Sequence, residues 1–505
     1  MPVLRRFPSP LVLFISLVFA SPSAAETPRD PVLIPTPGIP IVAVRILFET
    51  GSADDPAGKE GLCSLAARTV AYGGTDSLTH EEVTKIVFPV AGRIDVQVEK
   101  DYVVFIGHVT SEGLEDFYPV FRDVLLRPRW DQGDFDREQE SAMSYIENTL
   151  VAGDDEELGK NALEAFIYGD GPYGHPIRGT LSSIPSLTME DAKTFAARHF
   201  CRARIFAGVA GDYPEEFPAR LFADLEGLPA GEARPPDVPP PAGIEGVELL
   251  LVEKNADATA LSLGFPVIFD RTHPDYWALL LANQWLGEHR TFYGRLMNVM
   301  RVQRGLNYGD YSYIEPFRQD RWTRNPLPNI QRRRQLFTIW IRPVEPENGH
   351  FALRQAVHEL ETFIEKGIPD DEFDDAKEHL RNLSKLWSEG LQRRLGNAMD
   401  GVLTGTGDFA ERIEAEMAGL TADDVRKALK GHLQAGNMKV AAVCADADSL
   451  AEAIRENRAS PISYASGAVP EANRDYDAVV EALPLDVRRV EVVPAGEVFR
   501  EKRVW

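Results

Sequence analysis

Residues 48–75 read FETGSADDPAGKEGLCSLAARTVAYGGT and form the most informative stretch of the chain. An apolar run at Ile41–Phe48 precedes it and predicts a β-strand, and its glycine- and aspartate-rich first part leads into a predicted helix that contains Cys63–Arg68. Longer amphipathic helices separate further predicted strands at Tyr102–His108, Leu249–Glu253, Leu261–Phe265 and Leu336–Ile341. This arrangement predicts an α+β fold.

The chain repeats one pattern in its two halves. Leu187-Thr188-x-x-Asp191 opens a predicted helix that ends at His199 and is followed by an apolar run, and Leu420-Thr421-x-x-Asp424 does the same before His432. Thr188 and Thr421 are suitable N-caps, and the acidic residues in the first turn interact favourably with the helix dipole. We therefore expect two homologous α/β sandwich domains related by internal duplication. His199 and His432 then occupy one structural position twice, and neither is expected to bind a metal.

A proline-rich segment divides the halves. Leu228–Gly246 contains six prolines and few apolar residues, which is typical of an extended connector. Near the end of the chain, Val487–Val498 alternates loosely and is expected to dock as an edge strand. The predicted organisation is a signal peptide at 1–25, a first domain at 31–228, a linker at 229–246, a second domain at 247–460 and a C-terminal extension at 461–505.

Composition excludes several classes of protein. The 505 residues are 44% hydrophobic and 26% charged, as in an ordinary globular protein, and the formal charge is −24. Such an acidic chain repels phosphate backbones, so nucleic acid is not an expected partner. The three cysteines, Cys63, Cys201 and Cys444, allow at most one disulfide and contain no C-x-x-C pair for a structural zinc. Cys63 is expected to be a small buried side chain.

The N-terminus has the layout of a secretory signal peptide. Arg5 and Arg6 precede the apolar run Leu11–Ala20, and Ser23-Ala24-Ala25 offers small residues for cleavage before Glu26. Cleavage would leave a periplasmic or secreted protein with no membrane-spanning segment. An uncleaved anchor is the alternative, although the apolar run is about half the length that a spanning helix needs.

The order of several short motifs resembles the insulinase/pitrilysin-type peptidases, the inverted zincins. Phe48–Arg68 with Gly74-Thr75 is similar to their active-site region, Pro172–Thr180 to one of their loops, and Arg301-x-x-Arg304-Gly305-Leu306-Asn307-Tyr308 to their substrate-side signature. The resemblance covers most of residues 31–460. It implies a pair of homologous α+β domains in each chain, and two such pairs that close like a clamshell around an extended peptide.

The zinc motif of active members is missing. Those members carry H-x-x-E-H on the helix after the glycine-rich stretch, where two histidines bind zinc and the glutamate activates water. Aligned on the glycine and leucine that precede this motif, the histidine positions hold Ser64 and Arg68 and the glutamate position holds Ala67. The third ligand falls near Tyr145, with Glu138, Glu140 and Glu147 close by in the sequence.

These residue types cannot replace a zinc site. A hydroxyl, a methyl and a permanently protonated guanidinium supply neither the ligands nor the base. None of the ten histidines lies in an H-x-x-E-H or H-E-x-x-H arrangement. We therefore expect no metal and no catalytic residue in this chain, and no hydrolysis by the chain alone. An active peptidase with an unrecognised site is the least favoured alternative.

Arg301 and Tyr308 are the substrate-binding residues that the resemblance implies. In the family, an arginine and a tyrosine at this spacing reach towards the active site from the second half, and both are suitable donors to a substrate backbone or an oxyanion. From the residues alone, Arg301 would only complement a helix C-terminus capped by Gly305, with Tyr308 packed beneath it.

A chain that retains this pair but lacks the zinc motif resembles the companion subunits of some bacterial members of the family. The resemblance implies an exported, non-catalytic subunit that forms a heterodimer with a zinc-bearing homologue, so that the zinc belongs to the partner and a peptide is the substrate. The alternative is a stand-alone pseudopeptidase that binds peptides or scaffolds an envelope complex.

Arginines gather just after this signature. Six of them lie within seventeen residues, in an expected loop at Phe317–Gln335 between two strands: Arg318, Arg321, Arg324, Arg332, Arg333 and Arg334. A solvated charged loop is the commoner explanation of such a run. The sharper hypothesis is a basic rim that binds acidic peptide segments or an acidic face of the partner.

Overall fold

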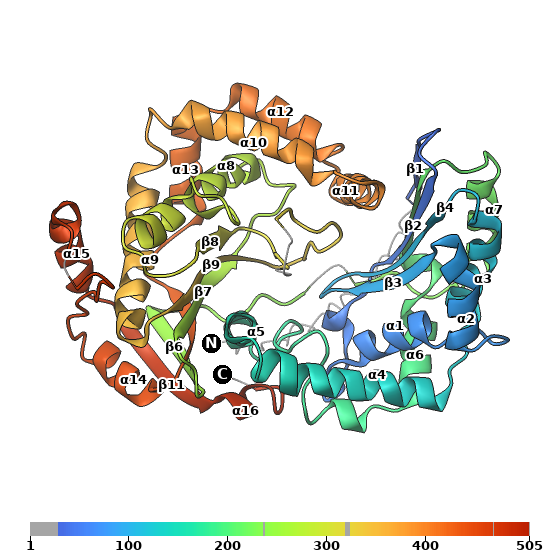
Figure 1. The fold of residues 1–505 in the computed structure, drawn as a ribbon, viewed down its shortest axis with the longest axis horizontal. Helices are drawn as coiled ribbons and strands as arrows, with labels where there is room; N and C mark the ends of the chain where they lie inside the picture. Colours follow the sequence, from blue (N-terminus) through green and yellow to red (C-terminus); the bar gives the residue numbers. More distant parts are fainter. Residues whose placement is uncertain (1–28, 236–237, 319–323, 468, 504) are drawn as a thin grey trace, which may run out of the picture.

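The computed structural model describes residues 29–235, 238–318, 324–467, 469–503 and 505. Within them, two β-sheets lie side by side, each with helices packed on both faces (Figure 1). The α+β prediction with two domains is therefore confirmed. The predicted signal peptide lies outside the described residues, as do Pro236, Arg321 and Trp322.

The first sheet has five strands in the order β1-β5-β2-β4-β3. Their bounds are β1 Val32–Pro35, β2 Ile41–Phe48, β3 Arg93–Val98, β4 Val103–Thr110 and β5 Ile205–Gly211. The helices of this half are α1 Leu62–Tyr72, α2 His80–Val87, α3 Leu114–Leu126, α4 Gln132–Ser144, α5 Asp155–Tyr168, α6 Met189–His199 and α7 Phe217–Leu225, and a π-helical segment, η3, spans Tyr145–Val151.

The second sheet has six strands in the order β11-β6-β10-β7-β9-β8. Their bounds are β6 Val247–Glu253, β7 Thr259–Val267, β8 Asp310–Tyr313, β9 Gln335–Val344, β10 Met438–Cys444 and β11 Val487–Pro494. The helices are α8 Tyr276–Gly287, α9 Gly349–Lys366, α10 Phe373–Trp387, α11 Leu391–Thr404, α12 Phe409–Gly419, α13 Ala422–His432, α14 Ala447–Arg455, α15 Arg474–Glu481 and α16 Ala495–Val498, and a second π-helical segment, η6, spans Met297–Val302.

The two halves exchange one helix each. Strand β2 is buried on both faces. Its even-numbered residues pack on helices of its own half, whereas Ala43 and Leu47 pack on Leu395 and Met399 of α11 from the second half. On that second face, the buried Arg45 donates to the carbonyl of Gln392 in α11 at 3.3 Å. In return, α5 of the first half packs on β6, β7 and β10 of the second sheet (Figure 1). Side chains alternate between the faces of a strand, so each buried strand contributes to two cores.

The internal repeat is confirmed in its local geometry. Helices α6 and α13 begin at capping boxes, in which the hydroxyls of Thr188 and Thr421 accept hydrogen bonds from the backbone N–H of Asp191 and Asp424. Each helix ends at a histidine and leads into a central strand, β5 or β10. The same local signals therefore produce the same element pair in both halves.

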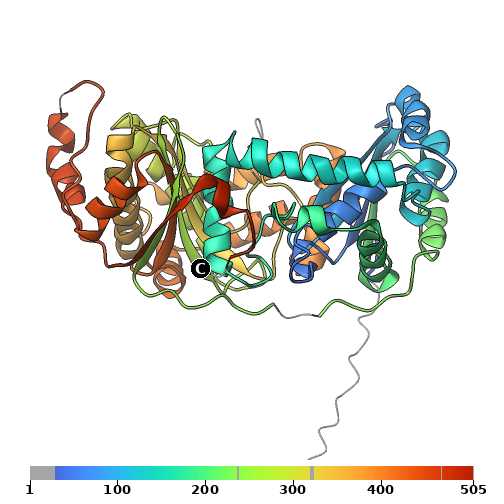
Figure 2. The same ribbon diagram turned by 90° about the horizontal axis from the view of Figure 1, so that it is seen from below.

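The C-terminal part of the chain contacts both halves. Strand β11 pairs in parallel with β6 at the edge of the second sheet, which confirms the edge-strand prediction for Val487–Pro494, whereas the last four predicted residues form α16. Beyond it, the carbonyl oxygens of Phe499 and Arg500 accept hydrogen bonds from the backbone N–H groups of Leu181 and Ser182 at 3.0 and 2.8 Å. The described parts of the proline-rich linker, 229–235 and 238–246, run along the lower edge of the molecule in Figure 2. No helix in the described ranges is long and apolar enough to cross a membrane.

Candidate functional site

Helix α1 carries the positions that hold zinc ligands in the resembling family. The helix begins after Gly61, which has a φ of +95°, and Asp55 anchors this start by accepting two backbone hydrogen bonds at 2.7 Å. Ser64 and Arg68 are one turn apart and line the same cavity. Ala67, at the position of the general base, is 0% exposed and packs in the core of the first half.

Arg68 forms an ion pair with Glu138 of α4. The Nε of Arg68 donates to Oε2 of Glu138 at 2.8 Å, and the Glu138 side chain is only 6% exposed. The guanidinium therefore neutralises a nearly buried carboxylate with a permanent positive charge, which is the electrostatic role of a metal ion. Because Ser64 and Ala67 add no imidazole or carboxylate, these positions contain no zinc ligand set.

Tyr145 holds the position that the alignment assigns to the third zinc ligand. It is the first residue of η3, lines the same cavity as Ser64 and Arg68, and has the guanidinium carbon of Arg178 4.4 Å from its ring centroid. Burial raises the pKa of Tyr145, so its phenol stays protonated and can donate a hydrogen bond at neutral pH. The structure thus brings together three of the four positions that the alignment predicted, all except Ala67.

The cavity that these residues line has a volume of about 280 Å³ and lies between the two halves. From the first half it is lined by residues of α1, β3, η3, α5 and the loop 176–178, and from the second half by residues 315–318, Arg332 and part of β9. Much of the wall is apolar, including Val96, Val98, Ile177, Phe317, Leu336 and Trp340. Polar groups with an apolar surround are the usual composition of a ligand site.

Arg301 and Tyr308 lie together but do not line this cavity. Arg301 donates from Nη1 to the backbone oxygen of Tyr308 at 3.2 Å, and its guanidinium carbon lies 4.9 Å from the ring centroid of Phe292. Gly305, with φ +66°, lies just beyond the end of η6 and donates to the Arg301 carbonyl at 2.8 Å, as a glycine cap does. The expectation that Tyr308 packs beneath the helix is wrong, because Tyr308 is 75% exposed.

Neither interpretation of the arginine run holds for Arg332–Arg334. Arg332 pairs with Glu164 at 2.5 Å, Arg333 pairs with Asp101 at 2.8 Å, and Arg334 donates to the carbonyl of Val238 at 2.7 Å. These side chains are part-buried, and the two ion pairs join the second half to the first. Arg318 instead lies at the cavity, paired with Glu99 at 2.8 Å.

The repeated histidines have protein partners. His199 Nδ1 lies 3.3 Å from the Thr50 hydroxyl and 3.0 Å from a guanidinium nitrogen of Arg204, and His432 Nε2 lies 2.8 Å from Asp275. The cysteines are free and buried, and burial raises the pKa of the Cys63 thiol well above its ordinary value, as expected of a structural side chain.

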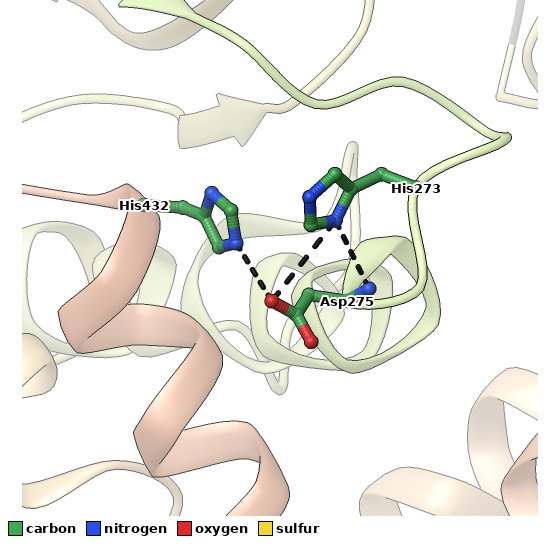
Figure 3. A group of neighbouring side chains, drawn as sticks. All are labelled: His273, Asp275 and His432. Atoms are coloured by element: carbon green, nitrogen blue, oxygen red, sulfur yellow. Dashed lines mark hydrogen bonds and ion pairs between the residues drawn. The ribbon is translucent and has the colours of Figure 1, made fainter.

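Among the described residues, one group of three has a spacing that could hold a metal ion: His273, Asp275 and His432 (Figure 3). Their ligand atoms lie within 4.8 Å of one another at the start of α8 and the end of α13. Asp275 already accepts from His432, and His273 Nδ1 accepts the backbone N–H of Asp275 at 3.1 Å. These contacts join the two helix ends without an ion, and none of the three residues lines the cavity.

Sequence reasoning missed Arg178 and the aromatic part of the cavity. Arg178 lies in the loop that carried part of the resemblance, but a single arginine in a loop has no pattern that marks it. Phe317 and Trp340 come from the second half and reach the cavity only through the way the halves pack. Because the packing between the halves brings them there, sequence spacing alone could not have found them.

Comparison with known proteins places both halves in one group. Residues 32–181 match the family model described as insulinase (peptidase family M16), and residues 186–380 match the model described as the peptidase M16 inactive domain. An uncharacterized zinc protease of Mycobacterium leprae is 25% identical over 286 residues, covering 56% of this chain and 62% of the relative, less than two thirds of its length. One of Streptomyces coelicolor is 23% identical over 401 residues, covering 77% and 82%.

Solved structures share the fold. A peptidase M16 inactive domain from Pseudomonas fluorescens superposes with a TM-score of 0.71 at 23% identity, covering 81% of this chain and 94% of that one. A protease from Helicobacter pylori superposes with a TM-score of 0.67 at 16% identity, covering 82% and 96%.

Proposed function

Because this chain belongs to the insulinase family of peptidases, family M16, we propose that it is a non-catalytic member that completes the peptidase site of a zinc-bearing homologue. In this proposal the homologue supplies the zinc and the general base. This chain supplies Arg301 and Tyr308, which hold the peptide backbone and donate hydrogen bonds to the developing oxyanion. The substrate is a peptide, and this chain binds no cofactor of its own.

The ion pair between Arg68 and Glu138 carries the non-catalytic part of the proposal. Zinc needs about three protein ligands at about 2 Å. Here a guanidinium already neutralises the carboxylate, and the neighbouring Ser64 and Ala67 contribute a hydroxyl and a methyl. A divalent ion at this place would have to displace a fixed cation.

The exposure of Tyr308, next to the half-buried Arg301, supports a role of this pair towards a partner. Around it, several large apolar side chains are also exposed, namely Phe292, Tyr293 and Val302. Exposed apolar patches of this kind mark interaction sites in soluble proteins. A second protein chain that covers the patch would bring the two hydrogen-bond donors to a substrate held between the chains.

The test is reconstitution with a zinc-bearing M16 homologue. We expect the isolated chain to contain no stoichiometric zinc and to leave peptides intact, and we expect hydrolysis from the complex. Arg301→Ala and Tyr308→Phe should lower kcat/KM of the complex by at least tenfold, whereas Arg412→Ala, an exposed arginine on α12, should not. Stoichiometric zinc with hydrolysis by the isolated chain would overturn the proposal, as would a complex that is insensitive to Arg301→Ala.

Export is part of the proposal and has its own test. If residues 1–25 are a cleaved signal peptide, the protein from the cell envelope or the medium begins at Glu26. Mass spectrometry of the intact protein reads this end directly. A cytoplasmic protein that begins at Met1 would contradict export without affecting the pairing.

A stand-alone, peptide-binding pseudopeptidase is the second candidate. The cavity between the two halves favours it, because one chain provides all of the described lining. This candidate predicts peptide binding by a chain that co-purifies with no homologue.

A further inference from the structure

The cavity between the two halves has an excess of positive charge. Six of its lining residues are cationic and four are acidic: Arg68, Lys100, Lys160, Arg178, Arg318 and Arg332 against Glu99, Glu157, Glu164 and Glu315. The whole chain has a formal charge of −24. A positive cavity in such an acidic protein is a local feature that the overall composition does not explain, and it attracts anions.

Each lining carboxylate already has a cationic partner. Glu164 is shared by Lys100 at 3.1 Å and Arg332 at 2.5 Å, and Glu315 makes two hydrogen bonds with Arg271 at 2.8 and 2.9 Å. The remaining pairs are Glu99 with Arg318 at 2.8 Å and Glu157 with Lys160 at 2.7 Å. The positive excess is therefore not neutralised within the described lining.

Of the six lining cations, Arg178 is the one without an ion pair among the described residues, because Arg68 is paired with Glu138, which lies outside the lining. Its guanidinium stacks on the Tyr145 ring, and among the described residues no carboxylate lies within ion-pair distance of it. Burial lowers the pKa of Arg178, and repulsion from Arg68 and Arg318 lowers it further, whereas Tyr145 and the Glu138 carboxylate act in the opposite direction. A partly buried cation among other cations is costly, and an anion placed beside it would relieve that cost.

The surroundings of Arg178 suit a carboxylate on an apolar residue. Arg68 and the protonated phenol of Tyr145 offer further donors, and a carboxylate accepts about four hydrogen bonds. The apolar side chains of Ile177, Phe317 and Trp340 would contact the carbon skeleton of a peptide residue. An inorganic anion would leave that part of the wall unused.

We propose that this cavity binds a peptide carboxylate, either a C-terminal carboxylate or the side chain of Asp or Glu, with the guanidinium of Arg178 as its main contact. The site lies within one chain and uses the positions where the zinc motif is missing. It requires neither zinc nor a partner subunit, so it goes beyond the proposed subunit function. It rests on the second candidate, peptide binding by the single chain, and is tested separately from the subunit function.

The test is calorimetric titration of the isolated full chain with three N-acetylated six-residue peptides of alanine and leucine. The first has a free C-terminus, the second is amidated, and the third is amidated and contains one internal glutamate. We expect the first or the third to bind at least tenfold more tightly than the second, and to bind more weakly as salt rises. Binding of the first alone identifies a C-terminal carboxylate, and binding of the third identifies a side chain.

Arg178→Gln is the diagnostic variant and Arg198→Gln, an exposed arginine at the end of α6, is the matched control. Arg178→Gln should weaken binding at least tenfold, and it should not lower the melting temperature appreciably, because it removes no ion pair. Three results would overturn the proposal. They are equally tight binding of all three peptides, a cavity that binds inorganic phosphate but none of the peptides, and an unchanged affinity in Arg178→Gln. These results do not depend on Arg301, so failure here is distinguishable from failure of the subunit function.

Discussion

Arg68, at one of the positions where the zinc motif is missing, forms a largely buried ion pair with Glu138. The Glu138 side chain is 6% exposed and that of Arg68 is 23% exposed. Removing one member of a buried pair leaves an uncompensated charge, which costs more than the pair itself contributes. Removing both members avoids that penalty.

We therefore expect Arg68→Met to lower the free energy of unfolding by about 2 kcal/mol, and Arg68→Met with Glu138→Gln to recover most of the loss. Urea denaturation of the wild type, both single variants and the double variant gives the coupling energy. Additive single effects would mean that the two side chains do not interact in solution.

Asp310, the first residue of β8, couples stability to pH. It is 0% exposed, one carboxylate oxygen accepts from Asn307 at 2.7 Å, and the other has no partner among the described residues. Burial raises the pKa of Asp310 to about 8, against about 3.9 in an unfolded chain. The folded state therefore keeps a proton that the unfolded state releases, and stability falls as pH rises from about 4 to about 8.

Asp310→Asn should make this decline shallower, by up to about 1.4 kcal/mol per pH unit, because asparagine has no proton to release. Burial also raises the pKa of Glu288 to about 8, so part of the decline remains. Denaturation between pH 5 and 8 measures the slope, with the exposed Asp475→Asn as control. Equal slopes in the wild type and Asp310→Asn would contradict the burial effect.

At the scale of elements, the duplication places an equivalent capping box in each half, and the two can be tested independently of each other. The hydroxyls of Thr188 and Thr421 make the same hydrogen bond at the start of equivalent helices in separate cores. Loss of an N-cap hydroxyl typically costs about 1 kcal/mol. Sites that share no contacts usually add.

Thr188→Ala and Thr421→Ala should each lower the free energy of unfolding by about 1 kcal/mol, and the double variant by the sum. Thr194→Ala, an exposed position inside α6, should change it by less than about 0.5 kcal/mol. Chemical denaturation provides the values. If the two cap variants behave like Thr194→Ala, the hydroxyls do not cap these helices.

The elements were largely predictable because their signals are local. The predicted strand Ile41–Phe48 has the same ends as β2, and Tyr102–His108 lies within two residues of β4. The packing of α5 and α11 was not predictable. An amphipathic helix shows in its sequence that it must bury one face, but not which sheet it will cover.

At the scale of the whole molecule, the same limit applies to the candidate site. Ser64, Arg68 and Tyr145 could be predicted from an alignment because they are fixed relative to one motif. The charge partners of Arg332 and Arg333 could not, because Glu164 and Asp101 are more than one hundred residues away in sequence and reach them only through the packing of the halves. Because these partners are distant in the chain, the arginine run by itself predicts solvent-exposed side chains.

Arg333 is the clearest example of such a distant partner. It donates to Asp101 from its side chain at 2.8 Å and from its backbone N–H at 2.8 Å, and Asp101 is 1% exposed. Arg333→Ala should lower the free energy of unfolding by about 2 kcal/mol, although Arg234 remains as a second partner of Asp101. Thermal and urea denaturation measure the loss, and the exposed Arg324→Ala is the control. A loss no larger than that control would restore the solvated-loop interpretation.

The exchange of α5 and α11 has a mechanical consequence. A pair of domains joined by an extended linker would ordinarily swing apart like a hinge to admit a ligand. Here such a swing would pull Leu395 and Met399 off the first sheet and α5 off the second, and would expose two apolar surfaces to water at once. The exchanged helices therefore hold the two halves together. Access to the space between the halves depends on side chains and loops at the entrance, and the two pieces would stay associated if the linker were cut.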